Sequence, residues 1–153
     1  MPHTPTMLHK LQKPTGAFMG ASWISLFIGI GGYLGGLWNS SFPMTEKGYY
    51  FTVLMYGLFA SISLQKIVRD RLEGIAVTSI YYGLSWVSII LSTSLLGVGL
   101  WNNPEMLIIE KGFFAMAFVL SLFASIAVQK NIRDLALYPK EESVVETKEE
   151  EDE

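Results

Sequence analysis

Charged residues are missing from long segments of this chain. Four segments contain no Asp, Glu, Lys or Arg: residues 14–45, 48–65, 74–104 and 112–129. A helix that rises 1.5 Å per residue needs about 20 apolar residues to cross a hydrocarbon core of about 30 Å. The pattern therefore predicts an all-α integral membrane protein with four transmembrane helices, at residues 17–38, 43–71, 75–101 and 104–136.

Capping residues suggest where these helices begin and end. The second helix is expected to start after Ser41 with Pro43 in its first turn, and the fourth after Asn103 with Pro104 at the first helical position. Proline's missing amide hydrogen costs nothing there. Gly74 is expected to end the second helix in the left-handed conformation that glycine adopts readily.

An internal repeat relates the two halves of the chain. Residues 46–70 and 110–134 are identical at twelve of twenty-five positions, and Leu-Trp-Asn at 37–39 returns at 100–102. Each unit has two helices, and an even number of crossings returns the chain to its starting side. We therefore expect two parallel tandem helical hairpins, related by an axis along the membrane normal.

The repeat divides the chain into four parts. They are an N-terminal arm (1–16), a first two-helix repeat (17–73), a second two-helix repeat (74–138) and an acidic tail (139–153). The tail holds eight acidic side chains against one lysine after residue 140 and is expected to be disordered and solvated.

Basic residues indicate the orientation. Short cytoplasmic loops are enriched in Lys and Arg. Lys10 and Lys13 precede the first helix; the basic residues at the other helix ends on that side are Lys66, Arg69, Arg71, Lys130 and Arg133. The opposite side has only Lys47 and Lys111 near its helix ends. Both termini are thus expected in the cytoplasm, with Trp38 and Trp101 as anchors at the outer interface.

The repeated motifs resemble a known family. Leu-Trp-Asn, Glu-Lys-Gly followed by two aromatic residues, and Gln-Lys-x-x-Arg-Asp occur twice between residues 17 and 137. Tandem hairpins with these motifs resemble the YiaA/YiaB family of bacterial inner membrane proteins, and residues 68–82 are similar to the YiaA type in particular. The resemblance implies a multi-pass protein of the cytoplasmic membrane of a Gram-negative bacterium. It implies no established activity and transfers no catalytic residue.

Small residues are candidates for helix packing. Gly31-x-x-x-Gly35 overlaps Gly32-x-x-x-Gly36 in the first helix; the small residues on the facing helices are Gly57, Ser61, Ser121 and Ser125. Faces without bulky side chains let helices approach closely in a membrane. The glycine face either packs inside the four-helix bundle or forms a pore lining or dimer face.

Two charged groups have competing interpretations. Glu46, Lys47, Glu110 and Lys111 either form a polar ligand or cation site at the outer face or act as interfacial anchors. The basic residues that set the orientation are interpreted as topological signals. Alternatives are contact with anionic lipid headgroups or a regulatory phosphate or partner site.

Catalytic chemistry is not expected. The chain has no cysteine, 50% hydrophobic residues and only 16% charged ones, against about a quarter in soluble domains. His3 and His9 lack a metal-ligand pattern, and the four charge-free segments, which are expected to lie in the hydrocarbon core, contain no Asp, Glu, Lys, Arg or His for a proton relay. We therefore predict no enzyme activity, no cofactor, no metal site and no nucleic-acid partner.

The expected partners are the lipid bilayer and either a second copy or another membrane protein. The first functional hypothesis is a non-enzymatic protein that acts by association in the membrane, as a subunit, scaffold or stress-related component. The alternative is an oligomeric passive channel or facilitator for a small neutral or cationic solute. That channel would use the glycine-lined face of the first helix with Tyr33, Tyr56 and Trp86.

Overall fold

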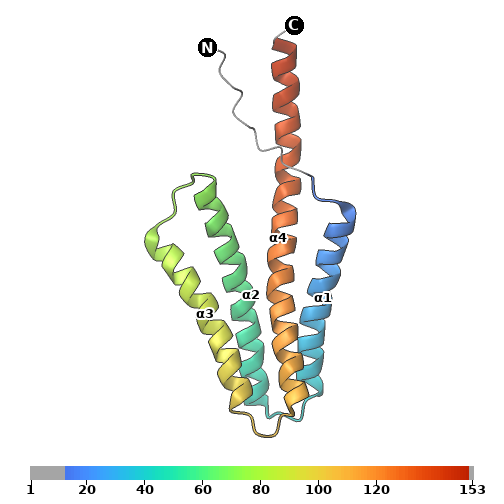
Figure 1. Ribbon diagram of the computed structural model, residues 1–153, viewed down its shortest axis with the longest axis vertical. Helices are drawn as coiled ribbons and strands as arrows, with labels where there is room; N and C mark the ends of the chain where they lie inside the picture. The colour runs from blue at the N-terminus through green and yellow to red at the C-terminus, as the bar shows by residue number, and fades with distance from the viewer. Residues whose placement is uncertain (1–12, 152–153) are drawn as a thin grey trace.

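The protein is a bundle of four long helices (Figure 1). The computed structural model describes residues 13–151, and the side chains of residues 13–137. The helices are α1 (Gly16–Asn39), α2 (Met44–Leu72), α3 (Ser79–Trp101) and α4 (Ile108–Glu151). Each contains a segment long and apolar enough to cross a membrane, which in α4 is Ile108–Leu137. The prediction of an all-helical chain with four candidate spans is confirmed.

The connections lie at opposite ends of the bundle. The α1–α2 and α3–α4 connections are at one end, and the α2–α3 connection is at the other, on the same side as the start of α1 (Figure 1). Helix α4 extends well past this second end. His3, His9, Lys10 and most of the N-terminal arm lie outside the described residues.

Threonine side chains cap the N-terminus of the first helix of each repeat. The Phe18 amide donates to Thr15 Oγ1 and the Tyr81 amide donates to Thr78 Oγ1, each at 3.3 Å. Such a side chain satisfies an amide that has no partner within the helix. Because Thr78 caps α3, this helix begins at Ser79 and not at residue 75 as expected.

The second helix of each repeat begins later than expected. Pro43, not Ser41, is the N-cap of α2. Helix α4 begins at Ile108, because Asn103 Oδ1 accepts from the Glu105 amide at 3.2 Å in a local turn, so Asn103 and Pro104 do not start the helix. Both corrections concern residue types that stabilise turns as well as helix starts.

Gly74 ends α2 as predicted. Its φ is +75°, the Gly74 amide donates to the Arg71 carbonyl at 3.2 Å and the Ile75 amide to the Asp70 carbonyl at 2.8 Å. These two bonds are those of the Schellman motif, which satisfies carbonyls left free at the end of a helix.

The described part of the acidic tail, up to Glu151, is helical in the structure, where the sequence predicts disorder. Helix α4 continues without interruption through Pro139 to Glu151. Glu and Lys, which dominate this segment, both have high helix propensity. A segment that follows an already formed helix also escapes the cost of nucleation.

The main helix contacts are made between the repeats. Helix α1 packs mainly against α4, and α2 mainly against α3, while α2 and α4 meet in the centre. The two helices of one repeat contact each other much less. Exchanging α1 with α3 and α2 with α4 reproduces this set of contacts, as a pseudo-twofold axis between α2 and α4 requires.

Glycines mark the closest helix approaches. A Cβ atom added at Gly29 would lie 2.9 Å from the backbone nitrogen of Ser121. Gly36 faces Phe113 and Phe114 of α4, and the repeat-equivalent Gly99 faces Tyr49 and Tyr50 of α2.

The predicted glycine pairs of α1 divide between two environments. Gly32 and Gly36 face Phe113, whereas a Cβ at Gly31 or Gly35 would meet nothing within 4 Å. Gly32 and Gly36 therefore lie at the contact with α4, and Gly31 and Gly35 lie on an open face. Gly29, which belongs to neither of the two glycine motifs, makes the tightest contact of the helix.

Aromatic side chains fill the interior near the end where α1 and α2 are connected. The Tyr33 ring is fully buried, packs edge-on against Phe114 with 5.2 Å between ring centroids, and lies beside Phe118. Its hydroxyl donates to the Tyr50 carbonyl at 2.9 Å. This bond satisfies the polar end of an otherwise apolar residue.

The contact at Gly29 gives a test of the packing. Gly29→Ala should lower the free energy of unfolding by about 1–3 kcal/mol, because the new methyl group overlaps the backbone of Ser121. Gly31→Ala is the matched control, with unchanged or slightly higher stability. Denaturant titration of both variants in detergent micelles measures the difference, and equal stability would contradict the close α1–α4 approach.

Candidate functional site

Seven charged side chains form a network where α2 and α4 leave the bundle. Within each helix a lysine pairs with an aspartate one turn later: Lys66 Nζ lies 2.6 Å from Asp70 Oδ2, and Lys130 Nζ lies 3.0 Å from Asp134 Oδ2. Residues four apart lie on the same helix face, so these pairs follow from the sequence spacing.

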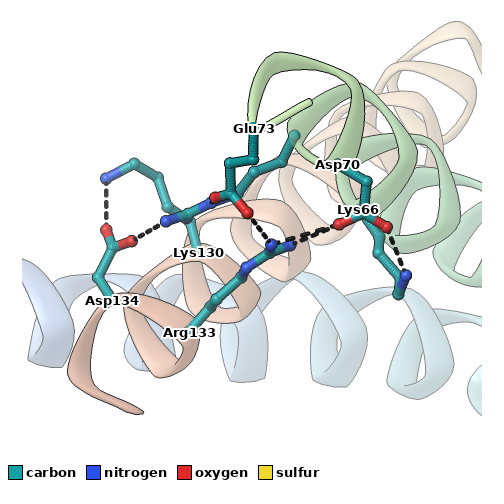
Figure 2. Close-up of polar contacts among 7 residues, drawn as sticks. Lys66, Asp70, Glu73, Lys130, Arg133 and Asp134 are labelled. Carbon is teal, nitrogen blue, oxygen red and sulfur yellow. Dashed lines mark hydrogen bonds and ion pairs between the residues drawn. The ribbon is translucent and has the colours of Figure 1, made fainter. Parts of the chain in front are cut away.

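The arginines connect the two repeats. Arg69 Nη2 lies 2.7 Å from Asp134 Oδ1, and Arg133 Nη1 lies 3.2 Å from Asp70 Oδ1 (Figure 2). Each arginine thus reaches the aspartate that follows its counterpart in the other repeat. The two ion pairs are reciprocal and join α2 to α4.

Glu73 adds a bridge between the two arginines. Its Oε1 accepts from Arg69 Nε at 2.9 Å and its Oε2 from Arg133 Nη2 at 2.6 Å (Figure 2). Its position in the C-cap of α2, just before Gly74, brings it over the α2–α4 contact.

Burial distinguishes the members of the network. The side chains of Asp70 and Asp134 are only 9% and 8% exposed, whereas those of Lys66 and Lys130 are 58% and 57% exposed. An ion pair at the surface contributes little, but removing one partner of a buried pair leaves a charge without compensation. The arginine–aspartate pairs therefore contribute more to the stability of the α2–α4 contact than the lysine–aspartate pairs do.

Smaller polar contacts continue along the same interface. Ser61 Oγ and Ser125 Oγ, at equivalent positions of the two repeats, lie 3.1 Å apart across α2 and α4. Each hydroxyl also lies within hydrogen-bond distance of a carbonyl of its own helix; since each has one proton, one serine donates to its carbonyl while the other donates across the contact. The prediction that Ser61 and Ser125 lie at a helix contact agrees with this geometry.

The other two predicted packing residues of these helices also lie in contacts. Ser121 packs against Gly29 of α1, and a Cβ at Gly57 would come within 2.7 Å of the Phe118 ring of α4. Ser121 also donates to the Ala117 carbonyl of its own helix at 2.7 Å.

One buried amide breaks the repeat symmetry. Asn131 Nδ2 donates to Ser22 Oγ at 3.2 Å between α4 and α1, and Asn131 Oδ1 has no hydrogen-bond partner among the described residues. The equivalent residue of the first repeat, Ile67, is fully buried. The bond adds a polar contact to the α1–α4 pair that α2–α3 does not share.

Three of the four charged residues at the opposite end, Glu46, Lys47 and Glu110, make separate contacts and do not meet one another. Glu110 Oε2 accepts from the Leu107 amide at 2.8 Å and so caps its own helix. Glu46 has the same position in α2, but Pro43 offers no amide, and Glu46 instead accepts from Asn103 at 3.2 Å.

The lysines beside these acids also differ. Lys47 donates to the Trp38 carbonyl at 3.0 Å, at the negative end of α1. Lys111 is half-buried. Among the described residues no group of three or more His, Cys, Asp or Glu is arranged to hold a metal ion. The geometry thus gives Glu46, Lys47 and Glu110 capping and bridging roles.

The remaining predicted residues lie at helix ends. Trp38 and Trp101 are 82% and 85% exposed, at equivalent positions on α1 and α3. Arg71 lies outside the ion-pair network, with its guanidinium 4.3 Å from the centre of the Tyr82 ring.

Sequence reasoning singled out the four basic residues of the network, Lys66, Arg69, Lys130 and Arg133, but not its three carboxylates or its connections between helices. The lysine–aspartate pairs follow from spacing within one helix. The arginine–aspartate pairs join helices far apart in the chain. The signal that could have found them is the recurrence of Arg-Asp at equivalent positions of a twofold repeat, where such residues face each other across the axis.

The four candidate spans, the twofold internal repeat and the charged ends define a class: multi-pass membrane proteins built from two tandem two-helix domains. The yiaA/B two helix domain matches residues 18–70 and again 81–134, so the chain belongs to this family.

A curated relative supports the assignment. The chain is 52% identical over 139 residues to inner membrane protein YiaA of Escherichia coli (strain K12), covering 91% of this chain and 95% of that protein. No solved structure matches this chain. The resemblance noted in the sequence is thereby confirmed, and the protein is an inner membrane protein of the YiaA family.

The reciprocal ion pairs predict paired mutational effects. Asp70→Asn and Asp134→Asn should each lower the free energy of unfolding by about 2–3 kcal/mol, because each removes a buried carboxylate and leaves a half-buried arginine with Glu73 as its remaining acidic partner. Lys66→Gln, at a mostly exposed lysine, should cost less than about 1 kcal/mol. Denaturant titration in micelles compares the three variants; a lysine variant as unstable as the aspartate variants would refute the assignment.

Proposed function

We propose that this protein acts by association in the inner membrane, as a non-enzymatic subunit or scaffold, with both termini in the cytoplasm. The observation that carries the proposal is the use of its polar groups. In the described chain, the charged network and the serine contacts are directed inward and join the two repeats. They stabilise the bundle and leave no acid, base and nucleophile grouped for chemistry.

The outward faces of α1 and α3 suit contact with other membrane components. Exposed apolar side chains follow both helices; examples are Ile24 and Ile28 on α1 and Ile90 and Val98 on α3. Gly31 and Gly35 leave room beside them for a neighbouring backbone. A lipid tail fills such a face as readily as a protein does, so association rests on close packing and not on hydrophobicity alone.

The orientation follows from the distribution of basic residues between the two ends of the bundle. Lys66, Arg69, Arg71, Lys130 and Arg133 lie toward the end where α2 joins α3, and only Lys47 and Lys111 toward the other. Cytoplasmic ends of membrane proteins carry the excess of Lys and Arg.

The alternative is a facilitator formed by an oligomer. The observation that favours it is the open face at Gly31 and Gly35, beside which several chains could enclose a path. The three aromatic residues assigned to it do not share one surface, however. Tyr33 is buried and bonded to the Tyr50 carbonyl, Tyr56 is half-buried and Trp86 is exposed. A path through one chain would also have to displace the packed aromatic interior.

Reporter fusions test the orientation. A green fluorescent protein placed after Glu153 should fluoresce and an alkaline phosphatase at the same position should be inactive, because the C-terminus is expected in the cytoplasm. Insertion of each reporter at Ser41, in the α1–α2 connection, should give the opposite result. Phosphatase activity at Glu153 would reverse the proposed orientation.

Native mass spectrometry of the full chain in mild detergent, with photo-crosslinking in intact membranes, tests the association. We expect a defined complex with a second copy or another membrane protein, and crosslinks from a photoreactive residue at Ile90 but not from one at buried Leu54. A homo-oligomer that retains a small solute would favour the facilitator. A monomer without crosslinks would contradict both.

A further inference from the structure

The charged network is symmetric except at one position. Six of its seven members form three equivalent pairs between the repeats: Lys66 with Lys130, Arg69 with Arg133, and Asp70 with Asp134. Glu73 has none, because the equivalent residue is Leu137. The network therefore holds four cationic side chains against three carboxylates. One carboxylate occupies a position that two symmetric arginines create.

The geometry of Glu73 is that of an anion held between two guanidinium groups. One carboxylate oxygen accepts from Arg69 at 2.9 Å, and the other accepts from Arg133 at 2.6 Å (Figure 2). A phosphate group offers the same contact, with two or three oxygens at similar spacing. The planar guanidinium fork is the side chain best suited to it.

The aspartates also hold the arginines in place. Asp134 fixes Arg69 through Nη2, and Asp70 Oδ1 accepts from both Nη1 and Nη2 of Arg133, at 3.2 and 3.3 Å. The arginine side chains are only 17% and 22% exposed. Removing Glu73 from between them would leave Arg69 Nε and Arg133 Nη2 oriented toward the same point. A preorganised pair of this kind binds an anion without first ordering two long side chains.

Glu73 itself is placed where it can leave. Its side chain is 37% exposed, and the residue is the C-cap of α2, directly before the left-handed Gly74. It lies one residue beyond the candidate span Met44–Leu72, a helix of 29 residues that at 1.5 Å per residue is long enough to reach the headgroup region. Basic pockets between helices at this depth are suited to phosphate-bearing headgroups.

We propose that Arg69 and Arg133 form a binding site for a phosphate-bearing anion, and that Glu73 occupies this site internally until the ligand displaces it. The phosphate belongs either to an anionic lipid headgroup or to a soluble phosphate. In both cases the phosphate contacts both repeats and replaces the Glu73 carboxylate as the anion between Arg69 and Arg133. The proposal is independent of the association role, since it is tested by measuring anion binding to the isolated protein.

Two variants act on the site in opposite directions. Glu73→Gln removes the internal competitor and should raise anion affinity about fivefold, the effect of one charge near the surface. Leu137→Glu supplies the missing symmetric carboxylate, four residues after Arg133, and should lower affinity by a similar factor. Glu110→Gln removes a carboxylate at the far end of α4 and is the matched control, with no change expected.

Two measurements distinguish the sources of phosphate. The first is native mass spectrometry of the four proteins after titration with phosphatidylglycerol, with phosphatidylcholine as the neutral comparison. The second is the shift in Tm on addition of inorganic phosphate in a neutral detergent. A response to phosphatidylglycerol alone assigns the site to lipid, and a response to inorganic phosphate alone assigns it to a soluble ligand. In either measurement, the site is supported if anion affinity is highest in Glu73→Gln, intermediate in the natural chain and lowest in Leu137→Glu. No binding in either arm, or a gain in Glu110→Gln equal to that in Glu73→Gln, would overturn it.

Discussion

The reciprocal pairing of Arg69 with Asp134 and of Arg133 with Asp70 is the interaction on which the arrangement of the bundle depends. Helices in a bilayer gain no hydrophobic free energy from leaving lipid for one another, so close packing and polar contacts decide which helices meet. Here the polar contacts join α2 to α4. The sharing of each charge between repeats fixes the two halves in one relative position.

The rest of the bundle follows from that axis. With α2 and α4 in the centre, each outer helix packs against the central helix of the other repeat, α1 on α4 and α3 on α2. Glycines allow the approach, with Gly36 facing Phe113 and Gly99 facing Tyr49 in equivalent contacts. The departures from symmetry are few and each has a local cause. Pro43, for example, cannot offer the amide that Glu110 finds at Leu107.

The sequence predicts the spans, the repeat and the left-handed end of α2 at Gly74, because these depend on local composition and backbone conformation. It does not predict which helices touch. Spacing alone cannot tell Gly31, on an open face, from Gly29, which meets the Ser121 backbone, since both belong to one glycine-rich helix. The charged residues were identifiable, but their partners lie about sixty residues away and depend on the axis between the repeats.

The pairing of α1 with α4 also constrains the order in which the molecule can assemble. A chain inserted from its N-terminus places α1 in the membrane long before α4 has been synthesised, and α2, its neighbour in sequence, offers it little contact. The first helix must therefore remain without its main partner until the last helix arrives. During synthesis the two-helix domain is a unit of sequence but not a unit of folding, and only the complete chain closes the bundle.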